Sequence, residues 1–232
     1  DWTFEAVKTE VDFSNLLTKV KGVETLVVDT ETDDLYGPIV GISLAINGKH
    51  GWYIPTVKEH GMELPLEKIA DLLRPILEDS KIGKIGHNIK YDLTILEQLN
   101  IELKPIAFDT MIAAYVLGAH LRSFDFDSCA ARELNYTSIP LDAIVKKPIK
   151  PSAILLADGA KLAEYAAEDA IVTFRLYEHY AKALNKEPTL KKVAESMDFP
   201  LIPVLRTMEK RGILVDESVL SKINTKLSGE IT

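Results

Sequence analysis

Residues 25–32 (TLVVDTET) place two carboxylates directly behind a short run of apolar residues. Such a run, rich in β-branched side chains, predicts a buried strand. Alternate residues of a strand face the same side, so Asp29 and Glu31 should point toward one place. A charged pair behind a strand can also be a solvated strand end, so this stretch leaves both interpretations open.

Short apolar strands and amphipathic helices alternate over the first 187 residues. Periodicity predicts strands at 25–28, 39–46, 51–55, 82–85 and near Ile106. It predicts helices at 66–77, 88–99, 109–117, 125–134 and 158–184, with a short helix at 141–145. A hairpin turn at Asn47-Gly48 makes the first three strands an antiparallel meander. The order β-β-β then α-β-α-β-α predicts an α/β fold of the ribonuclease H type, with a mixed five-stranded sheet flanked by helices.

The last part of the chain has the pattern of a second, incomplete unit. Segment 190–211 has helical spacing with two prolines that should bend it, 212–216 suggests a turn and short strand, and a helix follows from Glu217. So short a segment is a poor independent domain. We therefore expect one domain at 1–187 and the truncated, helical start of another at 188–232.

The composition is that of an ordinary globular protein, with 47% hydrophobic residues, 27% charged residues and a net charge of −8. The apolar runs fall short of a membrane span, and no signal peptide is visible. The single cysteine, Cys129, suits a reducing compartment and is expected to be a buried apolar side chain. The first residue is Asp1, which suggests a piece of a longer polypeptide. The net acidity opposes a nucleic-acid partner unless cations occupy an acidic cleft.

A second acidic segment, residues 88–92 (NIKYD), begins a helix just after a strand that ends near His87. The carboxyl ends of strands border the clefts of open α/β sheets, so Asp92 is placed where a site is expected. Asn88 also suits a helix N-cap. His87 is expected to be a packed or capping histidine with no catalytic role.

A third segment, residues 165–169 (YAAED), carries Tyr165 and Asp169 four residues apart, on one helix face. This pair alone could be a structural hydrogen bond, and Glu168 should face solvent or lie just outside the site. Four carboxylates brought together repel one another unless cations neutralise them. Hard oxygen ligands select Mg²⁺ or Mn²⁺, and two such ions can promote cleavage of a phosphodiester.

The three acidic segments resemble, in this order, the exonuclease motifs of the proofreading domain of bacterial DNA polymerase I, a family A polymerase. That domain belongs to the four-acid superfamily of 3′–5′ exonucleases, in the subgroup with tyrosine in the third motif. Segments 108–111 and 125–128 also look like family segments, and 199–216 resembles the opening of the polymerase domain. The resemblance covers nearly the whole chain.

The resemblance implies a two-metal-ion 3′–5′ exodeoxyribonuclease that releases nucleoside monophosphates from single-stranded or frayed DNA 3′ ends. Asp29, Glu31 and Asp169 would hold one divalent ion, and Asp29 with Asp92 would hold the second. The ions would be Mg²⁺ or Mn²⁺, with Zn²⁺ an option in one site. The Tyr165 hydroxyl would orient the attacking water, because an unperturbed tyrosine titrates at about pH 10 and keeps its proton at neutral pH.

The same resemblance implies contacts to the substrate. Leu35 would wedge against the terminal base, with ordinary core packing as the alternative, and Leu141 matches a position where relatives often have a larger apolar residue. Asn88 and the backbone near Thr30 would contact the terminal nucleotide. Arg122 would reach a phosphate, although it is offset by one residue from the family's arginine.

Two other functions fit parts of the sequence. A catalytically silent structural module would keep the fold, but all four acids and Tyr165 are present. An RNA 3′ exonuclease resembling ribonuclease D shares the motifs, but the polymerase-like tail argues against it. The expected partners are a single-stranded DNA 3′ end and a polymerase domain in the same parent chain, with no membrane. We expect a monomer in the bacterial cytoplasm, at the nucleoid, or in an organelle if the source is eukaryotic. The lysine-bearing loop at 146–150 would be solvated charge or a DNA contact.

Overall fold

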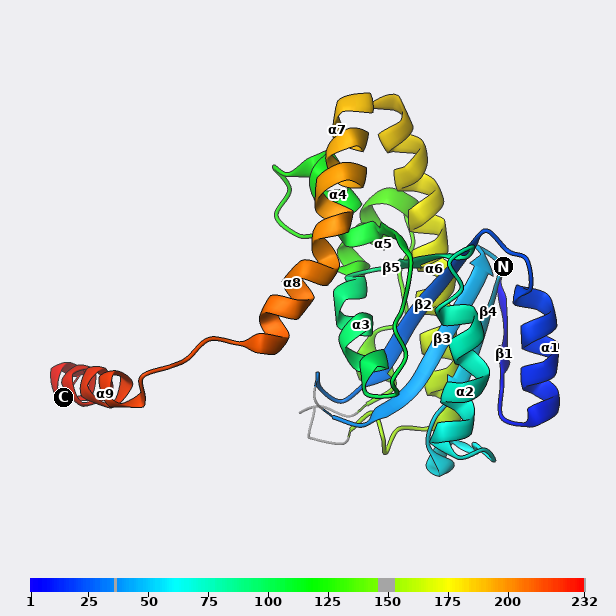
Figure 1. Cartoon of the computed structure of the whole chain (residues 1–232), viewed down its shortest axis with the longest axis horizontal. Helices are drawn as coiled ribbons and strands as arrows, with labels where there is room; N and C mark the ends of the chain where they lie inside the picture. Colours follow the sequence, from blue (N-terminus) through cyan, green and yellow to red (C-terminus); the bar gives the residue numbers. More distant parts are fainter. Residues whose placement is uncertain (36, 146–152, 232) are drawn as a thin grey trace.

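A computed structural model describes residues 1–35, 37–145 and 153–231. Within these ranges, six strands form one mixed sheet in the order β1-β4-β3-β2-β5-β6 (Figure 1). The strands are β1 (Thr3–Ala6), β2 (Thr25–Thr32), β3 (Ile39–Asn47), β4 (His50–Pro55), β5 (Gly83–Gly86) and β6 (Ile106–Asp109). The predicted α/β class is confirmed. The sixth strand, β1, was not expected, because four half-exposed residues show too little apolar periodicity.

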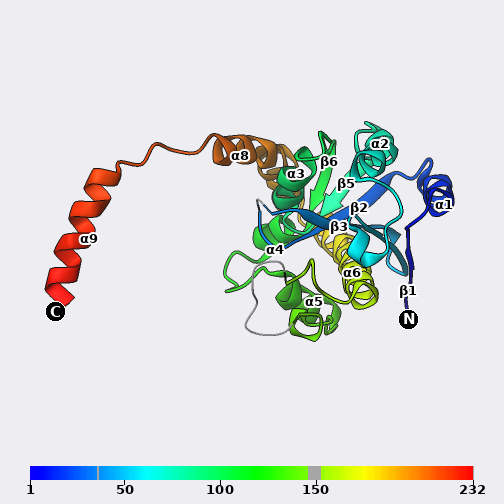
Figure 2. The same ribbon diagram turned by 90° about the horizontal axis from the view of Figure 1, so that it is seen from below.

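Helices cover both faces of this sheet. In the described ranges they are α1 (Glu10–Val20), α2 (Leu66–Leu77), α3 (Ile89–Glu97), α4 (Thr110–Gly118), α5 (Phe126–Leu134), α6 (Gly159–Lys186), α7 (Pro188–Val193), α8 (Phe199–Arg211) and α9 (Glu217–Ile231). Figure 2 shows α5 and α6 on one side of the sheet and α2 and α3 on the other. Helix α1 was missed from the sequence, whereas the predicted helices from 66 to 184 are present within a few residues. The short helix predicted at 141–145 is present only as a 3₁₀ turn at Leu141–Ala143.

Strand register determines which side chains reach the face under α6. The β2–β3–β4 meander is antiparallel as predicted, while β5 pairs parallel with β2. Asp29 is opposite Ser43, and Glu31 is opposite Gly41. The predicted turn joins β3 to β4. Helix α6 crosses β2, β3 and β4 on this face, so it can bring side chains to the acids of β2.

The C-terminal helices are only partly attached to this body. Helix α7, the π-helical turn Ala194–Asp198 and α8 form one continuous helical run. Phe199 and Ile202 are 5% and 2% exposed and belong to the main core. The strand predicted in 212–216 is wrong, since the backbone there finds no strand partner. Helix α9 is exposed throughout and lies apart from the body in both ribbon views.

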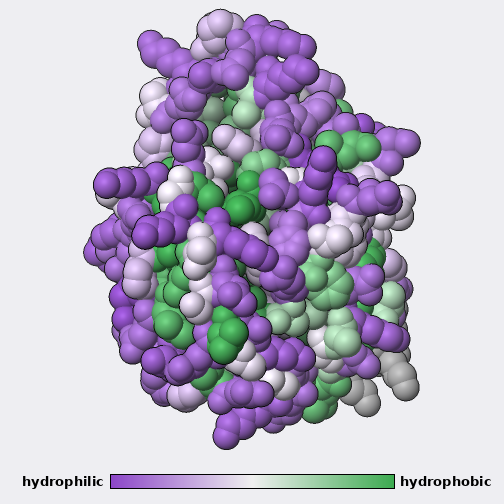
Figure 3. Space-filling model, turned by 90° about the vertical axis from the view of Figure 1, so that its right-hand side faces the viewer, coloured by the Kyte–Doolittle hydropathy of each residue, from purple (hydrophilic) through white to green (hydrophobic). Residues whose placement is uncertain are grey.

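Two surface features bear on where the protein can act. The face seen in Figure 3 is mostly hydrophilic, with hydrophobic side chains scattered in small areas among the polar ones. Across the described part of the chain, every helix is either too short or too polar to cross a membrane.

Cys129 is buried in α5, as predicted. The lysine-bearing loop at 146–150 lies outside the described residues.

Candidate active site

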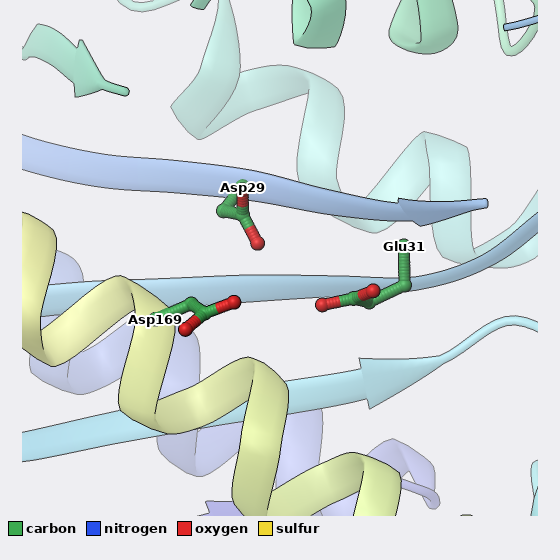
Figure 4. A group of neighbouring side chains, drawn as sticks. All are labelled: Asp29, Glu31 and Asp169. Carbon is green, nitrogen blue, oxygen red and sulfur yellow. The ribbon is translucent and has the colours of Figure 1, made fainter. Parts of the chain in front are cut away.

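Three carboxylates converge where β2 passes under α6. Asp29 and Glu31 come from one face of β2, and Asp169 comes from α6 (Figure 4). Each offers an oxygen atom that lies within 4.8 Å of the other two. Glu31 is buried, while Asp29 and Asp169 are partly exposed. The structure therefore brings together three of the four acids that the sequence singled out.

Small residues on the neighbouring strands make this approach possible. A side chain at Gly51 would have its Cβ only 2.9 Å from the carbonyl oxygen of Ala167, so glycine lets α6 lie close against the sheet. At Gly41 a Cβ would overlap the ring of Tyr53, whose hydroxyl donates to the carbonyl of Val40. Sequence periodicity carries no signal for these supports, because the contacts join separate strands and a helix.

Ser43 is a further residue that the sequence did not point to. It is fully buried, and its hydroxyl donates to a carboxylate oxygen of Asp29 across the β2–β3 pair at 3.3 Å. A donor on this oxygen orients the carboxylate and favours its ionised form. Position 43 falls on the predicted second strand, but the register that pairs it with Asp29 follows only from the sheet.

Asp92 reaches β2 from the opposite direction. It lies on α3, is 2% exposed, and accepts a hydrogen bond of 2.7 Å from the hydroxyl of Thr30. Thr30 alternates with Asp29 and Glu31, so its side chain faces the other side of the strand. The fourth acid is therefore outside the tight group of three, yet it is near enough to Asp29 for that charge to raise its pKa.

The electrostatics of the site favour protonation or cation binding. Burial raises the pKa of Asp29 to about 6, against opposing hydrogen bonds from Ser43 and the backbone of Thr30. Burial first, and then the charge of Asp29, raises the pKa values of Glu31, Asp92 and Asp169 well above their usual range. Ionised carboxylates this close need positive charge between them.

An unpartnered atom supports the fit of a divalent cation. Oδ1 of Asp169 is buried and has no hydrogen-bond partner, although a buried polar atom normally has one. It belongs to the group whose oxygens converge. A set of hard carboxylate oxygens is the donor chemistry that Mg²⁺ or Mn²⁺ prefers. Asp29, Glu31 and Asp169 thus fit one of the two expected ions.

Tyr165 lies one helical turn before Asp169 and packs, partly buried, against the smaller core cluster that includes Val40 and Tyr53. Burial, followed by the charges of Asp169, Glu31 and Asp29, raises the pKa of its hydroxyl above the ordinary value. The hydroxyl therefore keeps its proton at neutral pH. It can donate or orient, but it cannot act as a base.

Glu168 does not face solvent, so that half of its prediction is wrong. It is 2% exposed and accepts hydrogen bonds from the Tyr136 hydroxyl at 2.6 Å and from the backbone N–H of Ile139 at 2.7 Å. Helical position alone predicted a solvent-facing side chain, but the segment after α5 returns over this face. Glu168 anchors that segment beside the site.

Asn88 occupies the N-cap position of α3 in the left-handed region, with φ of 62°, but its side chain makes no capping bond. Asn88 is thus the N-cap residue, as the structural alternative held, but it does not cap the helix through its side chain. The carboxylate of Asp109 takes this role. His87 bonds Thr110, and burial lowers its pKa to about 4, so it is a neutral, packed histidine as expected.

The remaining predicted substrate residues are spread around the site. Leu35 packs partly buried against the main core, and Leu141 packs against the smaller cluster that also contacts Tyr165. Arg122 is exposed on the segment before α5. The structure places Leu141 near Tyr165 through this shared cluster. Among the described residues, no hydrogen bond or ion pair joins Leu35 or Arg122 to the acids.

Comparison with known proteins places the chain in a family. A family described as 3′–5′ exonuclease matches residues 4–185. DNA polymerase I of Pseudomonas aeruginosa is 33% identical over 235 residues, which cover 98% of this chain and 26% of the relative. DNA polymerase I of Rhizobium leguminosarum is 29% identical and covers 97% of this chain and 24% of the relative. The chain thus spans about a quarter of the length of these relatives.

Solved structures share the fold at low identity. The polymerase domain of Pol1 from M. smegmatis, in complex with primer-template DNA and a deoxynucleotide, has a TM-score of 0.73 at 19% identity, over 98% of this chain and 35% of that one. NrnC of Brucella melitensis with bound Mg²⁺ has a TM-score of 0.67 at 19% identity, over 91% of this chain and 95% of that one. The family match over most of the chain decides the assignment: the chain belongs to the 3′–5′ exonuclease family found in DNA polymerase I, and it is a nuclease domain.

Proposed function

We propose that this domain is a two-metal-ion 3′–5′ exodeoxyribonuclease that proofreads DNA ends for a polymerase. The observation that carries this proposal is the convergence of Asp29, Glu31 and Asp169, whose oxygens lie within 4.8 Å of one another. Asp92 lies across β2, and Tyr165 lies one turn before Asp169. Carboxylates from two separated segments repel one another when they converge, and a bound cation relieves that repulsion.

The residues divide into two sets of ligands. Asp29, Glu31 and Asp169 would hold one divalent cation, and Asp29 with Asp92 would hold the second. When bound, the pair would lower the pKa of the attacking water and stabilise charge on the phosphate and the leaving oxygen. The protein's own part is to fix the carboxylates. Ser43 donates a hydrogen bond to Asp29, and Thr30 donates one to Asp92. Tyr165 would orient the water through its protonated hydroxyl, as the raised pKa requires.

The substrate in this proposal is the 3′ end of single-stranded or frayed DNA, released as nucleoside monophosphates. Leu35 and Leu141 would contact unstacked bases, Asn88 the terminal nucleotide, and Arg122 a phosphate. The Asn88 side chain makes no capping bond, so its amide is available for this contact. The partner would be a polymerase domain in the same parent chain, and the domain would act as a monomer in the cytoplasm, at the nucleoid, or in an organelle of a eukaryote.

A second candidate is an RNA 3′ exonuclease. RNase D of Trypanosoma brucei shares the fold with a TM-score of 0.61 at 16% identity, over 78% of this chain and 65% of that chain. NrnC of Brucella melitensis bound to pGG shares it with a TM-score of 0.67 at 21% identity, over 91% of this chain and 94% of that chain. The relatives named DNA polymerase I favour DNA. A catalytically silent module is the third reading of the fold, and the unpartnered carboxylate oxygen of Asp169 argues against it.

The test is cleavage of matched DNA and RNA oligonucleotides, single-stranded and labelled at the 5′ end, with Mg²⁺ or Mn²⁺. The proposal expects stepwise shortening of DNA from the 3′ end with release of mononucleotides, and a chelator should stop it. Preference for the RNA substrate would support the ribonuclease candidate. Absence of shortening in both substrates would support the silent module.

A further inference from the structure

The hydrogen bond between Thr30 and Asp92 joins two buried residues from separate elements. Thr30 is 8% exposed and Asp92 is 2% exposed, and the hydroxyl of one donates to the carboxylate of the other at 2.7 Å. Thr30 stands between Asp29 and Glu31 in β2. One strand thus supplies two acids to one face and, from its other face, a donor to the acid of α3. Two residues further along β2, the hydroxyl of Thr32 forms a hydrogen bond with the hydroxyl of Tyr91 on α3.

The start of α3 is held by a second buried group. The carboxylate of Asp109, 1% exposed at the end of β6, accepts from the backbone N–H of Ile89 at 2.8 Å and of Asn88 at 3.4 Å. The same carboxylate caps α4 through Ile112 N–H at 3.0 Å. Helix α3 has no capping bond from its own N-cap residue. Asp109 therefore locks the N-terminus of the helix one turn before Asp92.

We propose that Thr30 and Asp109 are positioning residues for Asp92, Thr30 by fixing its carboxylate and Asp109 by fixing the start of its helix. The proposal rests on the nuclease function argued above. The Asp92 carboxylate is held at 2.7 Å from the Thr30 hydroxyl. The charge of Asp29 acts on it as well, so a carboxylate without these supports would turn away from that like charge. Groups that orient a metal ligand commonly matter about 10–100-fold for metal affinity or activity.

The alternative is a purely structural role, in which Thr30 only packs β2 against α3 and Asp109 is an ordinary helix cap. The two accounts differ in what an isosteric change does. Thr30→Val keeps the shape and removes the donor, whereas Thr30→Ser keeps the donor and removes a methyl group. A packing role predicts that valine is tolerated better than serine, and a positioning role predicts the reverse.

The first measurement is calorimetric binding of Mn²⁺ to the chain without DNA, followed by cleavage of single-stranded DNA over a range of Mn²⁺ concentrations. Thr30→Val should weaken the Asp92-dependent Mn²⁺ site by about 10-fold and raise the half-saturating concentration in parallel. Thr30→Ser should restore both. In an Asp92→Ala background, Thr30→Val should have no further effect, because the carboxylate on which it acts is gone.

The second measurement separates positioning by Asp109 from general loss of a cap. Asp109→Asn leaves a single acceptor oxygen and should weaken the same Mn²⁺ site. The matched control is Thr9→Ala, which removes the capping box of α1, a helix that carries no acid of the site. Both variants should lower the melting temperature, but only Asp109→Asn should change Mn²⁺ binding and amide hydrogen exchange in α3.

The possible outcomes distinguish failure of the positioning roles from failure of the proposed nuclease function on which they rest. If Asp92→Ala loses a Mn²⁺ site and cleavage while Thr30→Val and Asp109→Asn keep both, the positioning roles are wrong and the nuclease function stands. Valine tolerated better than serine at position 30 would also overturn the positioning role of Thr30. A natural chain that neither binds Mn²⁺ nor cleaves DNA would overturn both the function and this inference.

Discussion

At the scale of single residues, the site is a set of like charges that the fold forces together. Asp29, Glu31 and Asp169 present oxygens within 4.8 Å of one another, and burial removes the water that would screen them. Without cations this arrangement costs folding free energy, and with cations it becomes a binding site. Removing one of these charges should therefore lower the cleavage rate and raise the stability of the metal-free protein.

Replacing Asp29 by asparagine tests this opposition. Asp29→Asn keeps the size of the side chain and removes a charge shared by both proposed ions. Cleavage should fall by about 10³-fold, at the upper end for losing one charge-stabilising group. The metal-free melting temperature should stay the same or rise, since repulsion with Glu31 and Asp169 is relieved. Asp169→Asn should behave alike, and retained cleavage in either variant would contradict the assignment of ligands.

Tyr165→Phe should have a milder effect than loss of an acid. The hydroxyl keeps its proton because its pKa is raised, so its contribution is one orienting hydrogen bond. Removing one such bond should slow single-turnover cleavage by about 10-fold, with Mn²⁺ binding unchanged. A loss as large as that of Asp29→Asn would mean that the hydroxyl has a more direct chemical role.

The raised pKa values also make stability depend on pH. Asp29 has an ordinary pKa of 3.8 and a folded-state pKa of about 6. The folded state therefore binds protons more tightly, and this group stabilises fully below about pH 4 and loses that contribution as the pH rises through about 6. Urea unfolding in a chelator should show the natural chain losing stability from pH 4 to 7 relative to Asp29→Asn. Mn²⁺ should restore the loss at pH 7, where the carboxylates are ready to bind it.

At the scale of elements, the site depends on how closely α6 lies on the sheet. Gly51→Ala would set a Cβ 2.9 Å from the Ala167 carbonyl oxygen and 3.1 Å from the Ile171 side chain. Helix α6 would have to move, at a cost of about 1–3 kcal/mol in the free energy of unfolding. Because α6 carries Tyr165 and Asp169, cleavage should fall as well.

The matched control for this change is Gly229→Ala in α9. A Cβ at Gly229 meets nothing within 4 Å, and the helix is exposed throughout. Neither the melting temperature nor cleavage should fall. If both alanine variants behaved alike in denaturation and in the nuclease assay, close contact between α6 and the sheet would not be what supports the site.

At the scale of the whole molecule, the nuclease body and α8 share a core. Phe199 packs its ring against Phe108 with centroids 5.0 Å apart, and Ile202 is 2% exposed. Glu97 of α3 bonds Arg206 of α8, and Lys210 bonds the same carboxylate at 2.7 Å. The proposed boundary at residue 188 therefore precedes residues that the nuclease body needs for its own packing.

Truncation tests this dependence. A chain ending after Glu187 loses Phe199 and Ile202, each a buried side chain that contributes about 1.5–3 kcal/mol. Its melting temperature should drop by about 2–4 °C for each kcal/mol lost. A chain ending after Arg211 keeps both residues and should melt like the full chain, measured by circular dichroism. Equal stability of the two shortened chains would mean that α8 adds nothing to the nuclease core.

The sequence by itself predicted most of the elements and a candidate set of site residues. Local strand and helix spacing predicted that Asp29 pairs with Glu31 and Tyr165 with Asp169, as it predicted the meander and the long helix that carries Asp169, while the resemblance to the exonuclease family joined Asp92 to them and implied their roles. Periodicity predicts elements because it depends only on residues close together in the chain. The order of the three acidic segments indicated the family.

The tertiary structure alone decided how these pieces meet. It added β1, placed Asp92 across β2 from the other acids, buried Glu168, and gave the capping of α3 to Asp109 instead of Asn88. Each of these outcomes joins residues far apart in the chain. Such contacts depend on strand register and on the close packing of helices against the sheet, and local spacing carries no information about either.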